Sequence, residues 1–166
     1  MICDQFSSCL LKDQSNGSNR CNKCRSEDCR SIITCKENGK RYILHNDEKY
    51  TVSDFLVDGG VFVNEVGLNK CDRLVLVQDP DRFTVFLIEL KGKNVRHAIE
   101  QLYDTAHMYK KELVKMRTRF RVVCTSVPNM ANDSKTTQLK EEIYRVFGSL
   151  PVVRECTYEE WYSKVE

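Results

Sequence analysis

The segment that decides the fold runs from Asp72 to Lys91 and reads DRLVLVQDPDRFTVFLIELK. Two apolar runs, 73–77 and 83–90, flank the turn-forming residues 79–82. Turns rich in Asp and Pro connect neighbouring strands, so the segment predicts a hairpin. Both runs are apolar on both faces, which is typical of central strands that are covered on each side.

The remaining chain predicts further strands and two helices around this hairpin. Extended structure is expected near 41–45, 50–57 and 120–125, with a short last strand at 151–153. Apolar residues recur at helical spacing in 95–113 and in 134–147, where Asn94 is a candidate N-cap and Gly148 a natural stop. Thr157 and Glu160 have capping-box spacing, which predicts a short terminal helix containing Trp161.

This order predicts an α/β (α+β) fold with a mixed central sheet of four or more strands flanked by helices. The strand-helix-strand unit from Phe83 to Thr125 favours a parallel pair with a right-handed crossover. The composition, 166 residues with 41% hydrophobic and 30% charged side chains, fits a globular domain. Because we find neither a membrane-length apolar run nor a secretion signal, we expect no membrane association and a cytoplasmic location.

Cysteines concentrate near the start of the chain. Six of the nine lie within residues 1–35, so we expect a Cys-rich extension over 1–39 and a separate α/β domain over 40–166. Thiolates are good zinc ligands, and the spacing C-x2-C-x4-C-x5-C makes a candidate zinc set of Cys21, Cys24, Cys29 and Cys35. An iron–sulfur cluster or free thiols are the alternatives. The odd cysteine count indicates a reducing compartment.

Charged residues converge at one end of the predicted hairpin. If it closes symmetrically about residues 80 and 81, Asp72 faces Glu89, and Lys91 shares the face of Glu89 because strand side chains repeat with period two. Two adjacent carboxylates repel each other, and a divalent cation such as Mg²⁺ would relieve the repulsion. The alternative is a structural charge cluster, since Glu-x-Lys alone is a common pattern.

The stretch from Lys70 to Val75, followed after the turn by FLIELKG at 86–92, resembles the PD-(D/E)XK nuclease superfamily, which has the restriction-endonuclease-like fold. The resemblance covers roughly residues 58–125. It implies a four-stranded mixed sheet and metal-dependent cleavage of DNA or RNA. Asp72 and Glu89 would be metal ligands, Lys91 the catalytic lysine, and Gln101 a supporting residue on the following helix.

Two features depart from the family pattern. Cys71 stands where the family has its proline, and the helix that often donates another acidic residue is not evident; Glu65 and Asp58 are candidates for that extra carboxylate.

The sequence therefore predicts a magnesium- or manganese-dependent nuclease acting on DNA more readily than on RNA, as a homodimer or within a larger complex. The alternative is a non-catalytic module of the same fold that binds nucleic acid or protein. The net charge of +2 does not discriminate between them. A basic run is a candidate phosphate-contacting surface, and the alternative is a solvated face at a helix C-terminus: Lys110, Lys111, Lys115, Arg117, Arg119 and Arg121.

Overall fold

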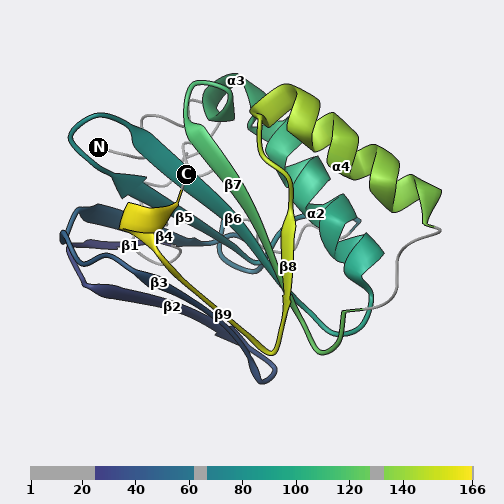
Figure 1. Ribbon diagram of the computed structural model, residues 1–166, viewed down its shortest axis with the longest axis horizontal. Coiled ribbons are helices and arrows are strands. Elements are labelled where there is room, and N and C mark those ends of the chain that lie inside the picture. Colours follow the sequence, from purple (N-terminus) through teal and green to yellow (C-terminus); the bar gives the residue numbers. More distant parts are fainter. Residues whose placement is uncertain (1–24, 62–66, 128–132, 166) are drawn as a thin grey trace, which may run out of the picture.

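The computed structural model describes residues 25–61, 67–127 and 133–165. They form three layers: helices, a six-stranded mixed sheet, and a three-stranded sheet (Figure 1). The elements in chain order are β1 (Arg25–Asp28), β2 (Ile32–Glu37), β3 (Lys40–His45), β4 (Thr51–Leu56), β5 (Arg73–Gln78), β6 (Phe83–Lys91), α2 (Val95–Met108), α3 (Lys110–Leu113), β7 (Arg117–Cys124), α4 (Ser134–Phe147), β8 (Val152–Glu155), β9 (Thr157–Trp161) and a final 3₁₀ turn (Tyr162–Lys164).

The β5–β6 hairpin lies at the centre of the larger sheet, whose order is β1-β4-β5-β6-β7-β8. Arg73 pairs with Ile88 and Gln78 pairs with Phe83, which confirms the register expected from a symmetric turn. The Asp79 carboxylate accepts the backbone N–H groups of Asp81 and Arg82, and this local bonding fixes the turn.

Helix α2 connects β6 to β7, and these two strands are parallel as the sequence predicts. The Asn94 side chain accepts the N–H of His97 and caps α2. Gly148 ends α4 in the left-handed conformation, at φ 66°. Both helices pack on one face of the six-stranded sheet, around a core that includes Leu87, Ile99 and Ile143.

The second face of this sheet is covered by the three-stranded sheet, of order β2-β3-β9. Tyr42 and Leu44 on β3 pack against Phe86 and Ile88 on β6 in a second buried cluster. The prediction of a terminal helix at Thr157–Trp161 is therefore wrong. These residues form β9, which pairs in parallel with β3, and its tertiary pairing outweighs the local capping signal.

The expected domain boundary after residue 39 also needs correction for the described residues. β1 pairs with β4 and β2 pairs with β3, so residues 25–39 belong to the sheets of the α/β domain. The boundary falls inside the β2–β3 hairpin, whose turn residues Asn38 and Gly39 both have positive φ values. Residues 1–24 of the expected Cys-rich extension lie outside the described part of the chain.

Over the ranges that the structure describes, no helix is both long and apolar enough to cross a membrane.

Candidate functional site

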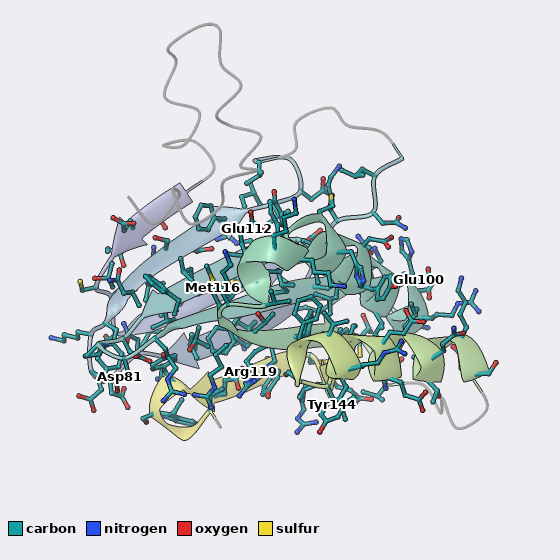
Figure 2. The ribbon with its side chains drawn as sticks, turned by 90° about the horizontal axis from the view of Figure 1, so that it is seen from above. Asp81, Glu100, Glu112, Met116, Arg119 and Tyr144 are labelled. Carbon is teal, nitrogen blue, oxygen red and sulfur yellow. The ribbon has the colours of Figure 1, made fainter. Side chains whose placement is uncertain are left out.

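The carboxylates of Asp72 and Glu89 meet at the end of the hairpin away from its turn. The Asp72 backbone N–H donates to Glu89 Oε2 at 3.1 Å, and the Leu90 N–H donates to Asp72 Oδ2 at 2.7 Å. Each strand thus binds the carboxylate of the other, in the facing register that the sequence predicts. Figure 2 shows the labelled Asp81 of the β5–β6 turn and Glu100 of α2 at opposite ends of the molecule.

Lys91 follows Glu89 on the same face of β6 and bridges it to helix α2. Its Nζ lies 3.4 Å from Glu89 Oε1 and donates to Gln101 Oε1 at 2.6 Å. Gln101 in turn donates from Nε2 to the backbone carbonyl of Lys70 at 2.8 Å. The amide therefore fixes the lysine from one side and holds the segment before Asp72 from the other.

Burial makes this pair of carboxylates electrostatically costly. The Glu89 side chain is only 1% exposed, and burial, followed by repulsion from Asp72, raises its pKa to about 8, although Lys91 opposes the shift. Burial also raises the pKa of Asp72 to about 6, with a further contribution from Glu37 and opposition from the Leu90 N–H. Two groups that share raised pKa values in one place are typical of functional sites.

A pocket of about 400 Å³ opens beside Asp72, between the end of β2 and the ends of the central strands β4, β5 and β6. It is lined by Lys36, Glu37, Leu56, Asp58, Gly59, Asp72, Arg73 and Leu90. Glu37 is the residue that sequence reasoning missed. It comes from β2 of the second sheet, and only the tertiary packing of that sheet brings it near Asp72.

The structure describes only one of the two candidates for an extra carboxylate. Asp58 lines this pocket and lies 3.5 Å from Lys70 Nζ, while Glu65 is outside the described residues. Within the described ranges, no group of three or more His, Cys, Asp or Glu side chains is arranged to hold a metal ion. The donors that are present, the carboxylate oxygens of Asp72 and Glu89, are of the hard type that Mg²⁺ prefers, and their repulsion fits a bound cation.

The four cysteines of the candidate zinc set occupy unlike positions. Cys21 and Cys24 lie outside the described residues, and Cys29 is exposed. Cys35 is completely buried in the cluster between the two sheets, where burial raises the pKa of its thiol to about 12. Metal ligation requires the thiolate, which this environment disfavours.

The basic run of 110–121 does not form one surface. Lys110 and Lys111 are exposed on α3, whereas Arg119 is half-buried on β7. Arg121 is buried, and its Nε and Nη2 donate to the carboxylate of Glu160 at 2.6 and 2.8 Å. Arg121 at least therefore belongs to the protein interior and does not contact phosphate.

Comparisons with protein-family models, with curated proteins and with solved structures found no match for this chain.

Proposed function

We propose that the chain is a metal-dependent nuclease of the restriction-endonuclease-like type, which hydrolyses phosphodiester bonds in DNA with Mg²⁺ or Mn²⁺. The observation that carries the proposal is the arrangement of Asp72, Glu89 and Lys91 at one end of a buried hairpin. Two carboxylates and an ammonium are held there by specific hydrogen bonds.

Asp72 and Glu89 would hold the cation, whose positive charge supplies stabilisation for the developing charge of a phosphoryl group. Glu89 must release its proton to do so, because metal ligands bind in the deprotonated form. Since its pKa lies at about 8, metal affinity should rise with pH through the neutral range.

Lys91 supplies the positive charge of the protein itself. Its ammonium is held between Glu89 and Gln101, so its position is set before substrate binds. A preorganised cation stabilises the charge that develops on the phosphorus oxygens in the transition state. Gln101 acts as a positioning residue, because its amide contacts Lys91 and the backbone of Lys70.

The test is a cleavage assay on single- and double-stranded DNA and RNA, with Mg²⁺, Mn²⁺ or EDTA. We expect metal-dependent cleavage of DNA that falls about 100-fold or more in Lys91→Ala and Asp72→Asn, since loss of one transition-state contact has that effect. Asp81→Asn is the matched control, because it removes an exposed carboxylate at the far end of the hairpin.

Wild type and all variants should first be shown to unfold cooperatively, so that a loss of cleavage is not a loss of folding. Cleavage that is equal in wild type and Lys91→Ala, or that persists in EDTA, would contradict the proposal. Nucleic-acid binding without cleavage under every condition would instead indicate the non-catalytic module on this fold.

A further inference from the structure

The three-stranded sheet has a second face, which points away from the six-stranded sheet. Side chains alternate along its strands, and the buried set of Ile33, Cys35, Tyr42 and Leu44 packs inward. The alternate set is exposed or half-buried and forms what we call the outer face: Ile32, Thr34, Lys36, Arg41, Ile43, His45, Thr157, Glu159 and Trp161.

Strand pairing arranges the outer face in three rows. Ile32 pairs with His45, which pairs with Trp161, so the first row is apolar and aromatic. The third row begins with Lys36 opposite Arg41, and thus carries two neighbouring cations. Apolar and positive groups therefore lie at opposite ends of one small surface.

The first row presents large apolar side chains to solvent. Trp161 is 37% exposed and Ile32 is 51% exposed. The indole stacks on His45 with the ring centroids 4.5 Å apart and the planes 9° from parallel. The His45 Nε2 lies 2.6 Å from Glu159 Oε1, and this contact fixes the imidazole beneath the indole. The aromatic row is thus a preorganised stacking surface.

The third row continues into the candidate site. Lys36 lines the pocket that also contains Asp72, so the outer face and the carboxylates are neighbours across the edge of β2. Arg41 is exposed beside it. A nucleic-acid strand whose backbone crosses the outer face toward Lys36 would therefore reach the pocket.

We propose that the outer face of the three-stranded sheet binds single-stranded DNA and leads it to the pocket beside Asp72. Bases stack on Trp161 and pack on Ile32, while Lys36 and Arg41 contact phosphates. The delivery of the strand to Asp72 rests on the proposed nuclease function, whereas binding to the outer face does not.

A single strand suits this surface better than a duplex does. Aromatic side chains beside basic residues bind strands whose bases are unpaired, because each base then offers a free ring face. In a duplex those ring faces are hidden by stacking, so Trp161 has no base to stack on.

The chain's single tryptophan makes a direct test available, because all indole fluorescence arises from the outer face. Oligo-deoxythymidine, oligouridine and a DNA duplex are titrated in EDTA, where no divalent metal supports cleavage. We expect the deoxythymidine strand to quench Trp161 and to bind more tightly than the other two. Lys36→Ala combined with Arg41→Ala should weaken binding about tenfold and reduce the salt slope by about 0.7 for each cation removed.

Lys110→Ala combined with Lys111→Ala is the matched control, since it removes two exposed lysines of α3 and should leave binding unchanged. Fluorescence anisotropy with labelled strands extends the test to Trp161→Ala, expected to weaken binding about tenfold, and to Trp161→Phe, which should retain most of it. Saturated binding without quenching, or a larger effect of the α3 pair, would overturn the proposal. Tighter binding of oligouridine would overturn the assignment to DNA.

Because this experiment contains no metal, it separates the two proposals. Binding at the outer face without cleavage in Mg²⁺ would contradict the nuclease proposal and support the proposed binding surface. Cleavage that does not depend on Trp161, Lys36 or Arg41 would support the nuclease proposal and contradict binding at the outer face.

Discussion

Two buried charge clusters on neighbouring strands of the large sheet are built in opposite ways. On β7, Arg121 donates two hydrogen bonds to Glu160, and the Tyr42 hydroxyl donates to the same carboxylate at 2.7 Å. On β6, Glu89 lies beside a second carboxylate, that of Asp72, with Lys91 at 3.4 Å. The first cluster joins opposite charges, and the second brings like charges together.

The pKa values follow the same division. Burial disfavours the charge of Arg121, but the hydrogen bonds that it donates to Glu160 and the charge of that carboxylate outweigh burial and raise the arginine pKa above its usual range. At Glu89, burial and Asp72 act in the same direction, and the neighbouring lysine does not offset them. The Arg121 cluster therefore satisfies its charges within the protein, while the Glu89 cluster would be satisfied by a cation from outside.

Breaking the cluster of Arg121 and Glu160 should have the largest effect on stability. Arg121→Met leaves the partly buried Glu160 without its main partner, which should lower the free energy of unfolding by about 3–5 kcal/mol. Urea unfolding measures the change. Arg154→Met is the matched control, because Arg154 is exposed and contacts the Tyr158 ring and the backbone carbonyl of Val153, so its loss should cost below about 1 kcal/mol. Equal effects would show that the two arginines do not differ in role.

The Glu89 cluster should make the free energy of unfolding depend on pH. Unfolded chains release the glutamate proton near pH 4.5, whereas folded Glu89 keeps it until about pH 8. The folded state thus binds more protons in this window, and the free energy of unfolding should fall as pH rises, by about 3 kcal/mol between pH 4.5 and 7. Glu89→Gln should make the profile less steep in chelator, and the remaining dependence is that of Asp72, whose pKa is raised to about 6. A profile in Glu89→Gln as steep as in wild type would assign the dependence to other groups.

A bound cation should satisfy the charges of the Glu89 cluster, as Arg121 and Glu160 satisfy each other. At a concentration 100 times its dissociation constant at pH 8, Mg²⁺ should stabilise the wild type by about 2.7 kcal/mol. The same concentration should stabilise it less at pH 6, because the ligands are then protonated and bind the ion more weakly. Thermal unfolding with Mg²⁺ and with EDTA measures the shift. Asp72→Asn should abolish it, while Arg121→Met should retain it despite its lower starting stability.

The smallest effect is expected at the contact between Lys91 and helix α2. Gln101→Met removes the acceptor of Lys91 and the donor to Lys70, and should reduce cleavage about tenfold and stability by about 1 kcal/mol. Gln101→Glu restores an acceptor for Lys91 alone. It should therefore recover cleavage more than stability, and identical losses in the two variants would contradict a positioning role.

The sequence predicts the centre of the fold well, because the signals there are local. The turn at Asp79–Arg82 sets the register of β5 and β6, and the register then places Asp72 against Glu89. Gln101 was predicted only through the family resemblance, and the structure does place its amide on Lys91. Asp72 and Glu89 flank one hairpin, so periodicity and turn chemistry are sufficient for these two residues.

The second sheet was not predicted, because its pairing is not local. Thr157–Trp161 has a plausible capping box, yet it becomes a strand through pairing with β3. A second pairing, of β2 with β3, brings Ile33 and Cys35 into the core, although the cysteine count predicts that they belong to a separate extension. Glu37 and the pocket beside Asp72 follow from this sheet, so no local pattern indicates them.

The parallel pairing of β3 with β9 also sets an order for folding. Tyr42 and Glu160 are hydrogen-bonded but lie 118 residues apart in the chain, so their contact closes a very long loop. Long-range parallel pairing is slow, because the entropy of loop closure is lost before the contacts form. On the ribosome, β2 and β3 emerge long before β9 exists. We therefore expect the small sheet to be completed last, after the hairpin that carries Asp72 and Glu89 has already folded.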